Sequence, residues 1–131
     1  MEASPNQYST AALAYLGDCV IELCVREHLV KIGLSSSAQL NSEALEYVKA
    51  VNQAEAMKKI MPILTEEEEA VFRRGRNMGH TNTPRSATVA QYRAATGMET
   101  LFGYLHLMGK NDRINELFTL AYLSDENNEN N

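Results

Sequence analysis

The chain has 131 residues, 44% of them hydrophobic, and a formal net charge of −5. This length supports one domain with a substantial core and leaves no room for a second. No apolar run approaches the roughly 20 residues of a membrane span, and the opening MEASPNQYST has neither the basic nor the apolar segment of a secretion signal. We therefore expect a cytoplasmic protein that makes no membrane contact.

The two cysteines, Cys19 and Cys24, lie within a strongly apolar helical pattern. Their separation matches neither a zinc site nor a disulfide framework. We expect two buried thiols in a reducing compartment.

Hydrophobic residues recur at helical spacing almost throughout, and no stretch alternates with a period of two for long. The sequence therefore predicts an all-α fold. The apolar residues of the first predicted helix are Leu13, Leu16, Val20, Leu23 and Leu29. Ser9 or Thr10 can cap this helix, which we expect to run to about Lys31 and to stop at Gly33.

Two shorter helices are expected between about Ser37 and Met61, with a break near residues 50–52 and an end at Pro62. The segment TEEEE predicts the start of the next helix, because Thr65 and Glu68 have the spacing of a capping box. The acidic run also complements the positive end of the helix dipole. We interpret these glutamates as structural rather than as metal ligands.

The segment MGHTNTP is rich in turn formers and predicts a loop that reaches Ser86, a plausible helix cap. A long, largely buried helix is then expected over about residues 87–108, and a short one over about 112–123. The end, SDENNENN, has the composition of a disordered tail. The predicted organisation is one folded domain over residues 1–123 and a tail over 124–131.

The two most apolar predicted helices each carry an acid in the middle, Asp18 and Glu99. A carboxylate that faces the core is costly unless it is paired or bound to a metal. Glycines also interrupt both helices, Gly17 beside the first acid and Gly97 and Gly103 around the second. Close approach of the two helices would explain the glycines and would bring the acids together. A hard cation such as Mg²⁺ between them would relieve their repulsion, and the alternative is two exposed or arginine-paired acids.

A second unusual feature is the stretch over residues 71–93, which contains five arginines and no acid in a chain that is acidic overall. An arginine cluster of this kind typically binds an anion, and the nucleic-acid backbone is the commonest anion of that extent. The stretch therefore favours a nucleic-acid ligand.

The segment LAYLGDCVIE, residues 13–22, resembles the signature helix of the ribonuclease III family, in which a glycine–aspartate pair follows two apolar residues. Three further features are similar to the Mini-III branch of that family: EEEEAVFRRGRN with a proline-containing basic loop, QYRAATGMETLFGYLHL, and the short length. Bacterial members of this branch have the catalytic domain without a double-stranded RNA-binding domain. The resemblance spans about residues 9–118.

The resemblance implies an all-helical endonuclease domain that forms a homodimer through the apolar face of its first helix. It also implies Mg²⁺-dependent cleavage of double-stranded RNA, with precursor 23S ribosomal RNA as the substrate of the branch. The catalytic and metal-binding pair carries over as Asp18 and Glu99. The products would carry 5′-phosphate and 3′-hydroxyl ends.

A catalytic domain without a separate RNA-binding module must hold the duplex with its own surface. The residues expected to contact RNA are Arg73, Arg74, Arg76, Asn77, His80, Arg85 and Arg93. For Arg93 a structural role is equally open, because it lies on an apolar helix and could instead hold Glu99 or another acid in place.

The chain departs from the longer family members at two positions, where Ala14 and Thr96 replace acids. Few protein ligands would then bind the metal, and water and phosphate would supply the rest. Glu22, one turn after Asp18, is a candidate for a further contact, although a solvated or arginine-paired glutamate is the simpler interpretation. Within the branch, residues 78–80 replace an expected lysine, and Thr88 stands where an aspartate is common.

Two other functions stay open at this point. The first is a catalytically inactive ribonuclease III-like domain that only binds RNA, and the second is an α-helical dimeric adaptor with no nucleic-acid role. The presence of both Asp18 and Glu99 argues against the first, and the acid-free arginine stretch argues against the second.

Overall fold

The computed structural model describes residues 7–79 and 86–124, and within these ranges the chain is helical with no strand. The α-helices are α1 (Thr10–Lys31), α2 (Ser37–Val48), α3 (Ala50–Ile60), α4 (Glu66–Arg76), α5 (Val89–Leu107) and α6 (Asn111–Phe118). A short 3₁₀ helix, η2 (Met61–Ile63), precedes α4, and a π-helical turn, η3 (Thr119–Leu123), follows α6. The prediction of an all-α fold is confirmed. None of the described helices has the length and apolar character needed to cross a membrane.

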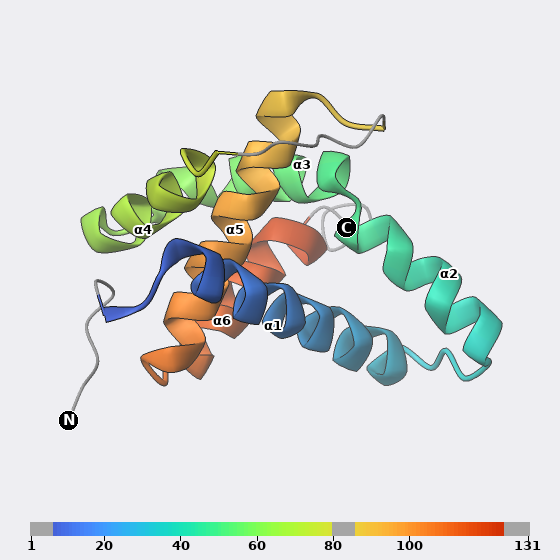
Figure 1. The fold of residues 1–131 in the computed structure, drawn as a ribbon. Coiled ribbons are helices and arrows are strands. Elements are labelled where there is room, and N and C mark those ends of the chain that lie inside the picture. Colours follow the sequence, from blue (N-terminus) through green and yellow to red (C-terminus); the bar gives the residue numbers. More distant parts are fainter. Residues whose placement is uncertain (1–6, 80–85, 125–131) are drawn as a thin grey trace.

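Helix α5 is the centre of the fold (Figure 1). It packs against α1, α3, α4 and α6, and its residues from Ala95 to Leu105 are buried with the exception of Glu99. A helix that is apolar all round has to be covered on every side. Helix α1 crosses α5 and also packs against α2. The two longest helices, α1 and α5, therefore form the frame on which the shorter ones are arranged.

Helix boundaries follow from side-chain caps. The Ser9 hydroxyl accepts a hydrogen bond from the backbone of Ala12 at 3.0 Å and begins α1, which ends as predicted before Gly33 with its φ of 101°. Thr65 and Glu68 form the predicted capping box of α4. The prediction of a cap at Ser86 is wrong, because α5 begins after Thr88, which forms a capping box with Gln91.

Glycines let helix backbones touch. A Cβ atom on Gly103 would lie 2.0 Å from the carbonyl oxygen of Leu13, so α1 and α5 pack closer than any side chain allows. The predicted close approach is therefore confirmed, with one correction. Gly97 belongs to a different contact, because a Cβ there would meet the ring of Phe72 on α4 at 2.6 Å.

The acidic start of α4 is structural, as predicted. Glu68 is buried, and Arg113 of α6 donates hydrogen bonds to both of its carboxylate oxygens at 2.8 and 2.9 Å. Burial alone would raise the pKa of Glu68, but the hydrogen bonds from Arg113 and from Thr65 outweigh it and lower the pKa. Glu67 accepts a hydrogen bond from the Tyr104 hydroxyl at 2.6 Å, so the acids fasten α4 to α5 and α6.

One of the two cysteines differs from expectation. Cys19 is exposed and Cys24 is half-buried, so the prediction of two buried thiols is wrong for Cys19.

Ser124, expected to begin the tail, is still helical and donates a hydrogen bond to the carbonyl of Leu120 at 2.7 Å. The rest of the expected tail lies outside the described residues.

The backbone contact yields a stability prediction. Gly103→Ala forces a methyl group into the backbone of Leu13 and should destabilise the protein by about 3 kcal/mol or more, since a rigid carbonyl cannot move aside as a flexible side chain would. Urea denaturation measures this free energy of unfolding. Gly79→Ala is the control, because its added Cβ meets nothing within 4 Å. Equal stability of the two variants would contradict the close contact.

Candidate active site

Asp18 and Glu99 lie side by side where α1 crosses α5. The preceding residue, Gly17, sets this geometry, because a Cβ atom there would lie 1.6 Å from the carbonyl oxygen of Glu99 itself. Asp18 is exposed and Glu99 is half-buried. The site therefore consists of a pair of carboxylates on rigid helices, with one member open to solvent.

The electrostatics of the pair are unfavourable for two negative charges. Burial, followed by the charge of Asp18, raises the pKa of Glu99 from 4.5 to about 8. Among the described residues, no cation lowers the pKa of Glu99 in the way that Arg113 lowers that of Glu68. At neutral pH the pair therefore holds a proton that a bound divalent cation would displace.

The donor set fits Mg²⁺. Within the described ranges, no third histidine, cysteine or carboxylate joins Asp18 and Glu99 to make a larger metal-binding cluster. Mg²⁺ is commonly bound by one or two carboxylates and completes its octahedron with water and substrate phosphate. Two adjacent oxygen donors that repel each other meet that requirement, and they leave positions open for a substrate.

The positions discussed as further ligands have other contacts. Glu22 forms an ion pair with Arg26 at 2.8 Å, the simpler of the two interpretations. Thr96 is buried, and its hydroxyl donates to the carbonyl of Tyr92 on its own helix at 3.1 Å. Ala14 has no donor atom on its side chain. In the part of the chain that the structure describes, the candidate ligands are thus Asp18 and Glu99.

The arginines at the end of α4 have different environments. Arg73 is exposed and bonded to Glu69 at 2.6 Å, and Arg76 is exposed with its guanidinium 5.9 Å from the ring centre of Phe72. Arg74 turns inward, where it donates to the carbonyl oxygen of Tyr8 at 3.0 Å and to the Thr10 hydroxyl at 3.2 Å. This last contact favours a structural role for Arg74.

Four further residues were expected to contact RNA, and the structure describes two of them, Asn77 and Arg93. Asn77 is exposed, and its side-chain oxygen accepts a hydrogen bond from Arg76 at 3.3 Å. Arg93 is exposed on α5 and does not contribute to the pKa of Glu99, so the structure does not support the alternative that it holds this acid. His80 and Arg85 lie outside the described residues.

Sequence reasoning missed Tyr122. Burial raises the pKa of its hydroxyl, and the nearby charge of Glu99 raises it further. The hydroxyl also lies 3.9 Å from the sulfur of Met98, to which it donates. Tyr122 lies in the π-helical turn η3, and a one-residue change of helical pitch leaves no signal in the hydrophobic pattern.

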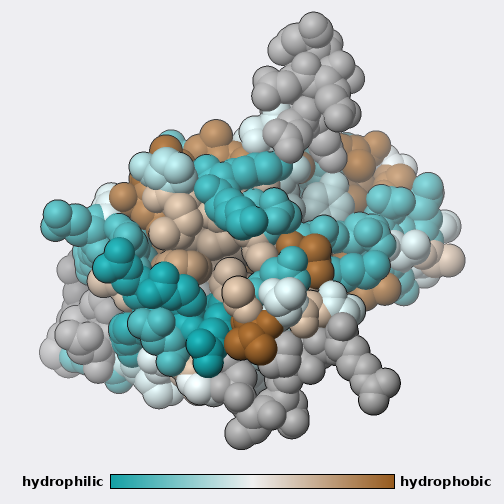
Figure 2. Space-filling model, turned by 90° about the horizontal axis from the view of Figure 1, so that it is seen from above, coloured by the Kyte–Doolittle hydropathy of each residue, from teal (hydrophilic) through white to brown (hydrophobic). Residues whose placement is uncertain are grey.

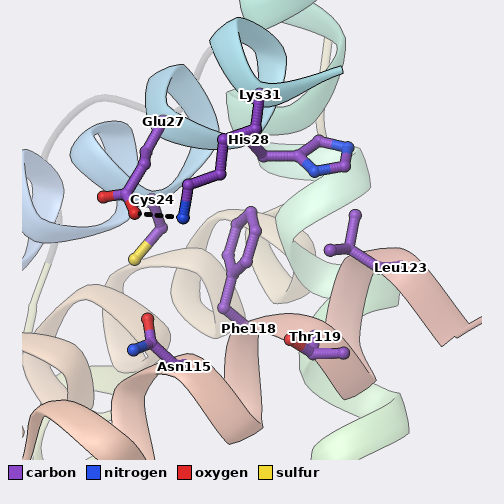
Figure 3. Close-up of a pocket in the computed structure, with 8 residues that line it drawn as sticks. All are labelled: Cys24, Glu27, His28, Lys31, Asn115, Phe118, Thr119 and Leu123. Atoms are coloured by element: carbon purple, nitrogen blue, oxygen red, sulfur yellow. Dashed lines mark hydrogen bonds and ion pairs between the residues drawn. The ribbon is translucent and has the colours of Figure 1, made fainter.

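A separate pocket of about 280 Å³ lies between the second half of α1 and α6 with η3 (Figure 3). Its wall includes Cys24, whose thiol pKa is raised to about 11 by burial and by Glu27, so the sulfur stays protonated and is a poor nucleophile. Glu27 is itself paired with Lys31 at 2.8 Å. A protonated thiol and a glutamate held in an ion pair do not make an activated nucleophile.

Comparison with known proteins agrees with this geometry. The family model described as Ribonuclease III domain matches residues 11–110. A Mini-ribonuclease 3 of Symbiobacterium thermophilum is 44% identical over 119 residues, 91% of this chain and 92% of the relative. A Mini-ribonuclease 3 of Brevibacillus brevis is 42% identical over 118 residues, 90% of this chain and 88% of the relative.

A solved structure shows the same architecture. The crystal structure of a protein from Fusobacterium nucleatum matches with a TM-score of 0.77 at 33% identity, over 86% of this chain and 89% of that one. The chain therefore belongs to the ribonuclease III family, a class of endoribonucleases, and it acts on RNA. The relatives place it more narrowly in the Mini-ribonuclease 3 branch, which confirms the resemblance drawn from the sequence.

The raised pKa of Glu99 predicts how stability depends on pH. The folded state keeps this proton up to about pH 8, whereas the unfolded chain loses it near 4.5. Between these values the folded state binds more protons, so the free energy of unfolding of metal-free protein should fall as pH rises. Glu99→Gln should remove this contribution and be more stable than wild type at pH 9, but not at pH 5.

Urea denaturation in EDTA at the two pH values measures the effect. Glu22→Gln is the matched control, since this acid lies one helical turn from Asp18 and is paired with exposed Arg26. The interpretation fails if Glu99→Gln and Glu22→Gln change with pH to the same extent.

Proposed function

We propose that the protein cleaves double-stranded RNA in a Mg²⁺-dependent reaction at Asp18 and Glu99. The observation that carries this proposal is the placement of two carboxylates at a backbone contact, one half-buried with a pKa raised to about 8 and the other open to solvent. Such a pair costs stability, and no cation among the described residues offsets that cost. Carboxylates whose pKa is shifted by burial and by a neighbouring like charge are concentrated at functional sites.

Each side chain has a distinct role in this proposal. A bound Mg²⁺ would lower the pKa of a coordinated water and neutralise charge on the phosphate oxygens. Glu99 supplies an oxygen from a position fixed by the buried helix α5, and Asp18 supplies a second from the exposed surface, where a phosphodiester can reach it. Attack of water on the phosphorus, with the 3′ oxygen as the leaving group, would give 5′-phosphate and 3′-hydroxyl ends.

The exposed residues of the arginine stretch would hold the duplex. Arg73, Arg76 and Asn77 extend from the end of α4, and Arg93 extends from α5. Contacts from such residues to phosphate and sugar position an A-form duplex by shape. His80 and Arg85 keep this role on sequence grounds, whereas Arg74 is occupied by the start of α1.

A homodimer and a ribosomal RNA substrate complete the proposal. Apolar side chains extend along one outer stripe of α1, with Tyr15 86% exposed and Leu23 and Val30 each 62% exposed. A second copy would cover this stripe and bring two carboxylate pairs to one duplex. Precursor 23S ribosomal RNA as the substrate and the cytoplasm as the location are part of the proposal, and both rest on the resemblance of the sequence to the Mini-III branch.

Catalysis is tested by removing either carboxylate. Asp18→Asn and Glu99→Gln should each lower the rate of duplex cleavage in Mg²⁺ by about a thousandfold, a barrier increase of about 4 kcal/mol, with binding and folding retained. Gel electrophoresis of a labelled duplex measures the rate, and Glu22→Gln should cut like wild type. Binding without cleavage by the wild-type protein would instead support the alternative of an inactive RNA-binding domain.

RNA binding is tested through its dependence on salt. Arg76→Gln and Arg93→Gln should each weaken duplex binding and reduce the slope of log K against log salt by about one. Fluorescence anisotropy in EDTA measures the affinity without cleavage. Arg26→Gln is the control, because this exposed arginine is paired with Glu22 outside the acid-free stretch. An unchanged slope for both arginine variants would place the RNA on another surface.

A further inference from the structure

A groove of about 480 Å³ lies between α3, α4 and the first turns of α5, within the size range of ligand sites. Its walls are largely apolar and include Ala54, Met57, Met61, Phe72, Ala90 and Ala94. On α5, Ala90 and Ala94 lie roughly opposite Glu99 around the helix. The groove is therefore distinct from the carboxylate pair.

The polar groups of the groove are hydrogen-bond donors. Lys58 and Arg76 line it, and no carboxylate of the described residues does. Lys58 also forms an exposed ion pair with Glu55 at 3.0 Å, which an incoming phosphate would have to replace. Thr88 and Gln91 also line it, and their oxygens accept hydrogen bonds within the capping box of α5, at 3.1 and 2.9 Å. The Thr88 hydroxyl hydrogen and the Gln91 amide hydrogens stay available to an occupant. A matching ligand carries acceptors and negative charge, together with an apolar surface.

The guanidinium of Arg76 adds a flat platform. It lies 5.9 Å from the ring centre of Phe72, which lines the same groove. Figure 2 looks onto the end of the molecule where α3, α4 and the start of α5 lie, and it shows hydrophobic surface enclosed between bands of hydrophilic side chains. Nucleobases stack on arginine planes when they are not paired.

We infer that this groove binds an unpaired nucleotide of the RNA substrate, next to the duplex that the arginine stretch holds. The inference rests on the proposed function and specifies its substrate. An unpaired base offers a flat apolar face and carbonyl acceptors at its edge, and its phosphate complements Lys58 and Arg76. A paired base cannot enter, because both of its faces are stacked. Arg76 belongs both to the groove and to the proposed duplex-binding residues, so a nucleotide joined to the duplex reaches the groove.

The test compares two labelled RNAs, a perfect duplex and the same duplex with one unpaired nucleotide, by anisotropy in EDTA. Wild-type protein should bind the second about tenfold more tightly, the order that one stacked base contributes. Ala90→Leu fills the groove from an exposed position and should abolish this preference while leaving affinity for the perfect duplex unchanged. Lys58→Gln should reduce the preference, and Ala38→Leu, exposed on α2, should preserve it.

The outcomes separate this inference from the proposed function. If wild type binds and cuts the perfect duplex without preference for the unpaired nucleotide, the inference is overturned and the proposed function stands. If neither RNA is bound, the proposed function fails. A preference that survives Ala90→Leu also overturns the inference and leaves an acidic peptide as the occupant to test next.

Discussion

The fold and the candidate active site both depend on the backbone contact between α1 and α5. Helices that meet through ordinary side chains keep their axes about 8–10 Å apart, but Gly17 and Gly103 leave no side chain at this crossing. The residues beside the glycines are thereby brought together, and these include Asp18 and Glu99. A packing feature of the core thus determines the separation of the two carboxylates, one of which is exposed at the surface.

Two glutamates of this protein, Glu68 and Glu99, have pKa shifts in opposite directions because their neighbours differ in charge. Arg113 and Thr65 stabilise the charged form of Glu68 and lower its pKa. Glu99 has another acid as its neighbour, and its pKa is raised to about 8. The first arrangement stabilises the fold, whereas the second stores repulsion that only a cation or a proton can relieve. A carboxylate with a lowered pKa and a paired arginine is typical of a structural role, whereas a raised pKa beside a like charge is typical of functional sites.

The local features of the fold were predictable because their signals are local. Ser9, Thr65 and Glu68 act as caps through hydrogen bonds that span three residues, and Gly33 stops α1 through its own backbone angle. The pairing of Asp18 with Glu99 was also predictable, because Gly17 precedes the first acid and Gly103 lies one helical turn after the second, and glycines on two apolar helices indicate a close crossing. The roles of Arg74 and Gly97 were not, because each depends on a partner far away in the chain.

The capping box of Thr88 and Gln91 separates the loop before α5 from the helix itself. Because the Thr88 hydroxyl accepts a hydrogen bond from the backbone N–H of Gln91, and the Gln91 side chain accepts one from the backbone N–H of Thr88, these two residues fix where α5 begins. The register of Glu99 within α5 is then insensitive to the composition of residues 77–87. The segment before Thr88 is consequently a natural place to exchange residues between relatives without moving Glu99.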